Sequence, residues 1–170
     1  MIDNNSLIKL LDKNNIKYTQ HFHPPLFTVN DSKKMRGVFD GAHTKNLFLK
    51  NKQKNFFLLS CLESTKINLK RLKKGLDLGN ISFAKEENLY ELLGVRPGSV
   101  TPFGLLNDIE KKIKFFLDLE LNNFNSFNFH PLTNTATINI KKDNFYNFFK
   151  IYNISINLIN LKSYREDNIN

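Results

Sequence analysis

The chain has 170 residues, of which 41% are hydrophobic and 24% are charged, the size and balance of one folded domain. A formal charge of +9 predicts attraction to phosphate groups, and a single cysteine excludes an internal disulfide framework and a zinc site built on several thiolates. No apolar run reaches the roughly 20 residues that span a bilayer, and the first residues lack the basic and apolar regions of a secretion signal. We therefore expect a cytoplasmic protein with no membrane partner.

The first third of the chain predicts one helix and three strands. Three leucines at i, i+3 and i+4 predict an amphipathic helix over about residues 4–14. Residues 17–23 predict a strand, which two prolines end. The apolar runs 47–49 and 56–59 are separated by the polar and charged residues 50–54, a pattern that predicts a hairpin buried on both faces with its tip in solvent.

The middle of the chain predicts two short helices and a loop. Asn68 is placed to cap a helix that carries the basic pairs 70–71 and 73–74. Such pairs are typical of a solvated helix face, and they could also contact RNA phosphates. Leucines in 89–93 predict a second helix, ended by a glycine. Two glycines and two prolines within residues 94–102 predict a loop.

The last third predicts three strands and a helix. An apolar run predicts a strand over 113–117, and alternation of polar and apolar residues predicts a half-buried strand over 135–140. An aromatic stripe over 145–152 has helical spacing and is interpreted as core rather than as a stacking platform for bases. Alternation over 154–158 predicts a last strand.

These elements together predict a single domain over residues 1–162 and a polar C-terminal tail over residues 163–170. Connections of hairpin length outnumber crossover helices, which favours antiparallel pairing. The expected fold class is therefore α/β (α+β), with a mainly antiparallel mixed sheet or a partial barrel flanked by helices.

The familiar catalytic and metal-binding signatures are absent from the sequence. His21 and His23 have the spacing of half a metal site on one strand face, but no cysteine or acidic residue lies near them. We interpret them as solvated strand histidines and expect no metal. Cys61 follows an apolar run without a local basic residue, which favours a buried structural thiol over a nucleophile.

Three segments carry polar side chains where a core strand begins or ends. Lys45 and Asn46 open the apolar strand near residue 47; a lysine at that place either snorkels to solvent or meets a charged substrate. The loop 98–102 is either a plain turn or a set of backbone N–H groups aimed at an oxygen anion. His130 lies between a phenylalanine and a proline, just before the strand over 135–140.

Taken in order, these segments and two shorter ones form a set that resembles the prolyl-tRNA editing family. The matching stretches are FTV (27–29), GAHTKNLFL (41–49), GVxPGSVTPF (94–103), ND (107–108) and NFHPLxNTAT (128–137). That family, also called the YbaK/prolyl-tRNA-synthetase-associated domain, includes free-standing deacylases and the editing insertion of bacterial prolyl-tRNA synthetases. The resemblance runs from the first helix to about Leu161 and is greatest to free-standing alanyl-tRNA(Pro) deacylases.

The resemblance implies trans-editing, the hydrolysis of alanine wrongly attached to proline tRNA. It places four residues in the catalytic site: Lys45, Asn46, Gly98 and His130. It implies a substrate-binding set that lines the aminoacyl pocket: Phe27, Thr28, Val29, Ser99, Val100, Thr101 and Pro102. The implied partners are the acceptor end of mischarged tRNA(Pro) and prolyl-tRNA synthetase, with no cofactor and no metal.

An aminoacyl ester is already activated, so its hydrolysis needs positioning and charge stabilisation more than a strong nucleophile. Loop amides around Gly98 would orient the ester carbonyl, and Lys45 would meet phosphate or oxyanion charge. His130 is either a base that positions water or a wall of the pocket. Strand alternation would place Lys45 and Asn46 on opposite faces, which leaves open how both touch the substrate.

Three alternatives to Ala-tRNA(Pro) hydrolysis remain open from the sequence. One is a deacylase for Cys-tRNA(Pro) or another small amino acid. A second is a non-catalytic tRNA-binding or synthetase-associated module, which would have no need of an intact Lys45, Gly98 and His130. A third is a general RNA-binding protein, which predicts exposed aromatic residues on basic strands.

Overall fold

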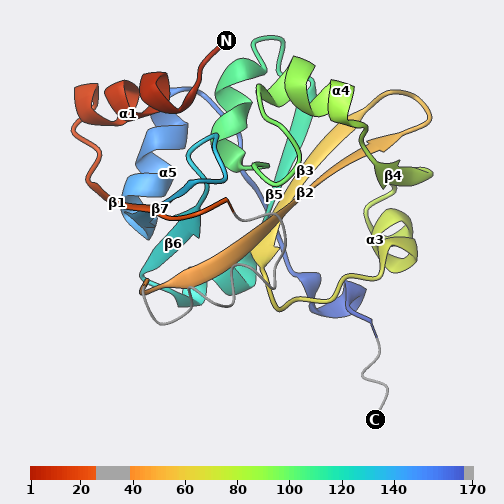
Figure 1. Ribbon diagram of the computed structural model, residues 1–170. Helices are drawn as coiled ribbons and strands as arrows, with labels where there is room; N and C mark the ends of the chain where they lie inside the picture. Colours follow the sequence, from red (N-terminus) through yellow and green to blue (C-terminus); the bar gives the residue numbers. More distant parts are fainter. Residues whose placement is uncertain (26–38, 167–170) are drawn as a thin grey trace.

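The computed structural model describes residues 1–25 and 39–166, which fold into one mixed sheet with helices packed on it (Figure 1). The strands are β1 (Tyr18–Phe22), β2 (Ala42–Asn51), β3 (Phe56–Leu62), β4 (Ile81–Phe83), β5 (Ile113–Asp118), β6 (Ser126–Phe129), β7 (Ala136–Lys141) and β8 (Asn157–Ile159). The helices are α1 (Asn4–Lys13), α3 (Leu69–Gly75), α4 (Glu86–Asn88), the π-helical turn η1 (Leu89–Leu93) and α5 (Lys142–Ile151). Three 3-10 helices complete the set: η2 (Pro102–Asn107), η3 (Leu119–Asn123) and η4 (Leu161–Tyr164).

The eight strands form a sheet in the order β1-β7-β6-β2-β3-β5-β8, with β4 paired to β2. Four pairings are antiparallel: β1 with β7, β6 with β7, and β2 with both β3 and β4. Three are parallel: β2 with β6, β3 with β5, and β5 with β8. The predicted mainly antiparallel mixed sheet is therefore confirmed. The strands at its two ends, β1 and β8, do not pair with each other in the described part of the chain, so the sheet is not a closed barrel.

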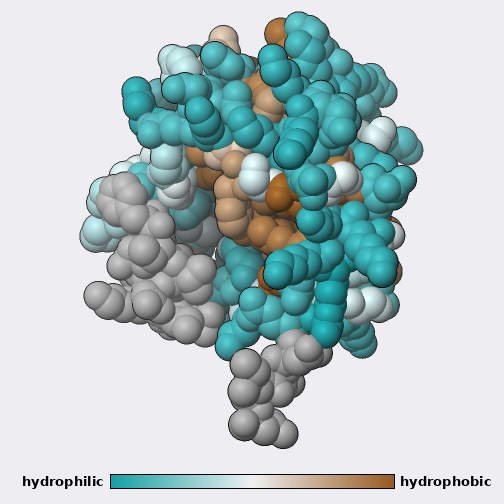
Figure 2. Space-filling view, turned by 90° about the vertical axis from the view of Figure 1, so that its right-hand side faces the viewer, coloured by the Kyte–Doolittle hydropathy of each residue, from teal (hydrophilic) through white to brown (hydrophobic). Residues whose placement is uncertain are grey.

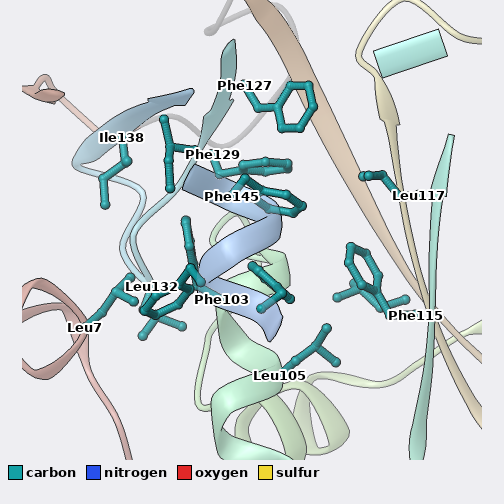
Figure 3. Packing of buried hydrophobic residues seen from close by; sticks show 14 of the residues in the cluster. Leu7, Phe103, Leu105, Phe115, Leu117, Phe127, Phe129, Leu132, Ile138 and Phe145 are labelled. Carbon is teal, nitrogen blue, oxygen red and sulfur yellow. The ribbon is translucent and has the colours of Figure 1, made fainter. Parts of the chain in front are cut away.

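One face of the sheet, called here the core face, is covered by α1, α5 and η2. Its cluster is rich in phenylalanine, and Figure 3 shows Phe103 of η2 beside Phe129 and Phe145. Ring centroids of Phe103 lie 6.1 Å from Phe129 and 6.5 Å from Phe145, in edge-to-face contacts that favour one packing arrangement. This confirms that the aromatic stripe of α5 belongs to the core.

The opposite face, called here the second face, carries a smaller cluster beneath α3 and η4. Leu49, Leu59 and Leu72 belong to that cluster and are at most 2% exposed. Figure 1 shows α3 beside β4, at the far side of the sheet from α1 and α5. Because side chains alternate along a strand, every residue of β2 is assigned to one face or the other, and this alternation decides what each site residue can reach.

Local sequence signals explain most of the elements. Helix α1 has the predicted range, and its N-cap Asp3 accepts a hydrogen bond from the Ser6 amide at 2.8 Å. The β2–β3 hairpin is confirmed, with Lys50 paired to Phe56 and an exposed tip. Asn68 caps α3 as predicted, since its side chain accepts hydrogen bonds from the amides of Lys70 and Arg71.

The last strand differs from the prediction over 154–158. Strand β8 spans Asn157–Ile159, and the sequence residues just before it lie outside any strand. Leu158 is half exposed, whereas Ile159 is buried. The reason is the parallel pairing with β5, in which Ile159 aligns with Asp118 and turns toward the second-face cluster. Strand β4, only three residues long, was not predicted.

Residues beyond 162 are docked on the domain as far as Glu166. The Asn68 amide donates to the Tyr164 carbonyl at 2.8 Å, and the Glu166 amide donates to the Lys66 carbonyl at 3.1 Å. Arg165 forms an ion pair with Glu120. The C-terminal segment thus holds the loop between β3 and α3 from outside. Among the helices of residues 1–25 and 39–166, none has the length and apolar character required to cross a membrane.

Candidate functional site

Lys45 lies on the second face of β2, directly opposite Cys61 of β3. Its ammonium donates a hydrogen bond to the backbone carbonyl of Thr65, in the loop that follows β3. Cys61 is fully buried, and this burial raises the pKa of its thiol to about 12, so the thiol stays protonated near neutral pH. The interpretation of Cys61 as a buried structural thiol is confirmed. Lys45 thus places an ammonium group next to this protonated thiol.

Asn46 points the other way, to the core face. Its side-chain amide donates to the Val100 carbonyl at 2.9 Å, and its oxygen accepts a hydrogen bond from the Ser60 hydroxyl at 2.5 Å. Strand alternation thus places Lys45 and Asn46 on opposite faces, as the sequence predicted. Both polar groups of the Asn46 side chain are used within the protein, so its observed contact is with the loop that contains Val100.

The loop over 98–102 is shaped by one turn and one helix cap. Gly98 has φ of +86°, a left-handed conformation that favours glycine, and the Ser99 amide closes the turn on the Arg96 carbonyl at 3.0 Å. Thr101 is fully buried and caps η2 by accepting a hydrogen bond from the Phe103 amide. The amides of Gly98 and Val100 donate to no acceptor among the described residues, so both are available to an oxygen of a ligand.

Asn107 fixes both ends of the segment that carries this loop. Its side-chain oxygen accepts a hydrogen bond from the Ile2 amide at 2.6 Å, and its amide donates to the Leu93 carbonyl at 3.0 Å. Gly94, in the left-handed conformation at the end of η1, passes so close to Asn107 that a Cβ would lie 2.5 Å from its amide nitrogen. Asn107 therefore fixes the chain just before this loop, at Leu93, and Asn46 fixes the loop itself, at Val100.

His130 follows β6 and is oriented by one backbone contact. Its Nδ1 lies 2.9 Å from the Ala136 carbonyl, and because a carbonyl only accepts, Nδ1 carries the proton. Burial lowers the pKa of His130 below its ordinary value, and the neighbouring His23 adds to that effect, although the Ala136 carbonyl opposes it. The neutral ring therefore leaves Nε2 unprotonated, and this nitrogen has no partner among the described residues. Such a nitrogen can accept a proton from water.

His23 is a site residue that sequence reasoning missed. It is only 8% exposed, which corrects the interpretation of His23 as a solvated histidine. Its ring lies with its centroid 6.1 Å from that of His130, and its Nδ1 and Nε2 contact the Pro24 carbonyl and the Thr137 hydroxyl, each at 2.9 Å. The only local signal was its place at a strand end before two prolines. The buried side-chain contact of His23 is with Thr137, which is far away in the chain.

Lys45 and His130 are brought to one face by the parallel pairing of β2 with β6. In that pairing His43 aligns with Asn128, and the Thr44 hydroxyl donates to the Asn128 carbonyl at 2.6 Å. Lys45 and His130 each lie two residues beyond this aligned pair. Since alternate residues share a face, both side chains belong to the second face, where the two strands end their pairing.

A glycine and a set of amide side chains hold β2 against β6 at this place. Gly41 has φ of +88°, and a Cβ on it would lie 2.6 Å from the Ser126 carbonyl oxygen. The side-chain amides of Asn128 and Asn139 both donate to the Asp40 carbonyl, at 2.8 and 2.7 Å. The entry to β2 is thus fixed in register, and with it the level of Lys45 relative to His130.

The predicted site residues are therefore arranged in two groups. Lys45 and His130 share the second face, while Asn46 reaches the loop over 98–102 from the core face. Thr101 and Ser99 are buried within that loop. Phe27, Thr28 and Val29 lie outside the described residues. Within those residues, no group of three or more His, Cys, Asp or Glu side chains is placed to hold a metal ion.

A cleft of about 460 Å³ lies elsewhere, between the end of η2, the start of β5 and the turn after α5. None of the predicted site residues lines it. The Lys45 ammonium and the unprotonated nitrogen of His130 belong to the second face near the place where β2 and β6 end their pairing, and the loop amides lie with Asn46 on the other face of β2. An ammonium, an unprotonated imidazole nitrogen and available amides are groups that suit hydrolysis of an activated ester.

Comparison with known proteins shows the family to which the chain belongs. Residues 23–148 match the family described as the aminoacyl-tRNA editing domain. The chain is 38% identical over 133 residues to the prolyl-tRNA synthetase associated domain-containing protein 1 of Xenopus laevis, covering 75% of this chain and 79% of the relative. It is 32% identical over 134 residues to the prolyl-tRNA editing protein ProX of Acetoanaerobium sticklandii, covering 78% of this chain and 82% of that protein.

A solved structure supports the fold. The crystal structure of a candidate trans-editing enzyme for prolyl tRNA synthetase superposes with a TM-score of 0.67 at 15% identity, covering 94% of this chain and 98% of that one. At this identity the likeness concerns the fold alone. The matched family range includes Lys45, the loop over 98–102 and His130.

Proposed function

The chain belongs to the aminoacyl-tRNA editing domain family, and we propose that it is a trans-editing deacylase that hydrolyses the ester of mischarged Ala-tRNA(Pro) in the cytoplasm. The observation that carries this proposal is the shared face of Lys45 and His130. One residue offers an ammonium and the other an unprotonated ring nitrogen, and Asn46, next to Lys45, holds the loop with available amides. The acceptor end of tRNA(Pro) is the proposed substrate, prolyl-tRNA synthetase a proposed partner, and the reaction asks for no cofactor.

In the proposed reaction, His130 acts as a general base. Its Nε2 takes a proton from water as the water oxygen attacks the ester carbonyl carbon. The resulting oxyanion lies against the Gly98 and Val100 amides, and Lys45, on the other face of β2, neutralises charge on the terminal phosphate. The bond between the carbonyl carbon and the ribose oxygen then breaks. The ribose oxygen takes the proton from His130, which releases alanine and the uncharged tRNA.

Before substrate binds, the Lys45 ammonium is hydrogen-bonded within the protein. Its ammonium is held by the Thr65 carbonyl, a neutral acceptor that is 5% exposed at the residue level. A lysine that donates to a carbonyl keeps its full charge and can exchange this acceptor for a phosphate or an oxyanion. Asn46 has a supporting part in the proposal, because it fixes the Val100 carbonyl and so orients the Val100 and Gly98 amides.

Selectivity is proposed to come from a steric wall. Alanine and proline differ by little more than the pyrrolidine carbons, and attractive contacts alone distinguish such groups by about 1–3 kcal/mol. We assign the wall to the loop over 98–102 with His130 on one side, and Phe27 and Val29 remain candidates for it from the sequence. A rigid wall rejects the larger ring by overlap, which discriminates better than attraction.

The test is a deacylation panel with Ala-, Cys-, Ser- and Pro-tRNA(Pro). We expect rapid hydrolysis of Ala-tRNA(Pro) and slow hydrolysis of Pro-tRNA(Pro), with the Lys45→Ala protein as the control for contaminating hydrolases. Preferred hydrolysis of Cys- or Ser-tRNA(Pro) would overturn the choice of alanine. Binding of tRNA without hydrolysis of any of the four would overturn the enzyme assignment and leave the non-catalytic module.

A further inference from the structure

Helix α3 presents a concentration of positive charge that the proposed reaction does not use. Four of its seven residues are basic and none is acidic. Leu72 anchors the helix in the second-face cluster, which leaves Lys70 and Lys74 exposed. Lys73 is directed toward β4, because its ammonium donates to the Asn80 side chain at 2.9 Å. The basic side chains thus line the helix from its solvent side to its β4 side.

An exposed aromatic ring lies on β4, next to this helix. Phe83 is 59% exposed, and it pairs with Leu49 of β2. Residues directly opposite in an antiparallel pair share a face, so Phe83 is on the second face, the face of Lys45. Figure 2, which views the side of the molecule that carries α3 and β4, shows apolar side chains in a hollow framed by hydrophilic ones. The partly buried Leu47 and Ile81 pack on the second-face cluster that contains Leu49 and Leu72.

The distance along β2 from Lys45 to the Phe83 ring matches a few nucleotides of RNA. Lys45 and Leu49 are separated by two steps of side-chain alternation, and a strand advances about 3.3 Å per residue, so about 13 Å of strand lies between them. Successive nucleotides of a stacked strand are about 3.4 Å apart. A short single-stranded stretch of RNA is therefore long enough to run from Lys45 to Phe83.

We propose that α3 and β4 hold the unpaired 3′ end of the substrate tRNA, through stacking on Phe83 and phosphate contacts with Lys70, Lys73 and Lys74. This inference rests on the proposed function, because it takes the aminoacyl ester to lie at Lys45. An exposed ring beside a run of lysines is the combination that binds single-stranded nucleic acid without reading its bases. Because Phe83 shares a strand face with Lys45 and the charge of α3 is opposite to that of RNA, we take the RNA 3′ end as its occupant.

The experiment measures RNA binding separately from hydrolysis. The probe is a fluorescently labelled single-stranded RNA that ends in CCA, titrated with the full chain and followed by anisotropy at several salt concentrations. The test variant is Lys70→Gln/Lys73→Gln/Lys74→Gln. Its matched control is Lys9→Gln/Lys13→Gln/Lys17→Gln, which removes the same charge from exposed positions on α1 and just before β1.

We expect the α3 variant to bind the probe at least about tenfold more weakly, with the slope of log K against log salt reduced by about 2, since each lost phosphate contact of a single strand contributes about 0.7. The control variant should keep the wild-type slope. Phe83→Ala should weaken binding by about tenfold and Phe83→Tyr should restore it, because stacking depends on the ring. Circular dichroism verifies the fold of each variant.

Equal losses in the two lysine variants, or unchanged binding in the α3 and Phe83→Ala variants, would overturn this inference. Hydrolysis of Ala-tRNA(Pro) by the wild-type protein, combined with either result, would leave the proposed function standing. Probe binding that depends on α3 and Phe83 in a protein that hydrolyses none of the charged tRNAs would support this surface and overturn the enzyme assignment instead.

Discussion

The side-chain amide of Asn46 donates a 2.9 Å hydrogen bond to the carbonyl of Val100, and this bond ties the loop over 98–102 to strand β2. The bond lies on the core face, opposite Lys45, so the residue next to the proposed charge-bearing lysine has a different task. Asn46 holds the loop that carries the amides, whereas Lys45 is the residue proposed to meet the substrate.

Asn46→Asp should weaken both the fold and the activity. A carboxylate cannot donate to the Val100 carbonyl, and leaving that acceptor without its partner costs about 1–3 kcal/mol in the free energy of unfolding. Urea unfolding and single-turnover deacylation measure the two effects. Ser60→Ala is the control, since it removes only the hydroxyl that donates to the Asn46 oxygen and leaves the loop bond. Equal losses of activity in the two variants would contradict the role given to the Asn46–Val100 bond.

Lys45→Ala should lower the deacylation rate of Ala-tRNA(Pro) by about 10²–10³-fold, the usual cost of removing one group that stabilises transition-state charge. The thermal midpoint should change little, because the ammonium contacts a single carbonyl outside the strand pairing. Lys45→Met, which keeps the apolar stem, separates charge from packing and should be as inactive as Lys45→Ala. Full activity in Lys45→Met, or unfolding of Lys45→Ala, would show that this lysine only covers the strand end.

The activity should fall at acidic pH with the titration of His130. Burial lowers its pKa below the ordinary value of 6.5, so the ring is neutral at pH 7 and loses its function as a base only below that value. The rate should therefore be flat above about pH 6.5 and decrease as the pH falls through the lowered pKa. A pH profile of single-turnover rates from pH 5 to 8 measures this.

The free energy of unfolding should also depend on pH through His130, and it should decrease as the pH falls. The unfolded chain binds the His130 proton near pH 6.5, whereas the folded protein binds it at a lower pH, so the unfolded state holds more protons between the two values. The contribution to stability is thus fully present above about pH 6.5 and is lost as the pH decreases toward the folded pKa. His130→Gln should remove this part of the pH dependence. An unchanged profile in that variant would contradict the assignment of this pH dependence to His130.

Gly41→Ala should destabilise the protein by about 3 kcal/mol or more, because a left-handed backbone and an overlap with backbone atoms act together. The added Cβ would lie 2.6 Å from the Ser126 carbonyl oxygen, which cannot move without disturbing β6. Gly79→Ala is the matched control: its φ is +70°, but its nearest contact is 3.6 Å away, so only backbone strain of about 1 kcal/mol applies. Chemical denaturation compares the two. Similar losses would contradict the role of Gly41 in seating β2 on β6.

Local periodicity predicted the helices and hairpin correctly, since α1, α5 and the β2–β3 hairpin depend on neighbours in the chain. The parallel pairings were beyond its reach. Alignment of β2 with β6 depends on residues far apart, such as Gly41 and Ser126, and no local pattern encodes that contact. The same cause turned Ile159 inward, since its direction is decided by β5.

The candidate site was predictable as a set of residues and not as an arrangement. The resemblance singled out Lys45 and His130, but their common face follows from the register of β2 and β6. His23 was interpreted as solvated because its partners, His130 and Thr137, lie more than 100 residues further along the chain. Burial of a polar residue is a property of the tertiary fold, and strand periodicity alone does not report it.

Strand β2 pairs with β3, β4 and β6, and this has a consequence for synthesis of the protein. The first two partners follow β2 closely, so that part of the sheet can assemble while the chain is still growing. β6 and β7 are made much later, and joining them to β2 closes a long loop. A nascent or prematurely terminated chain can therefore contain β2 already paired with β3 and β4, including Lys45, before His130 has been made. Lys45 and His130 therefore come together only when these later strands join the sheet.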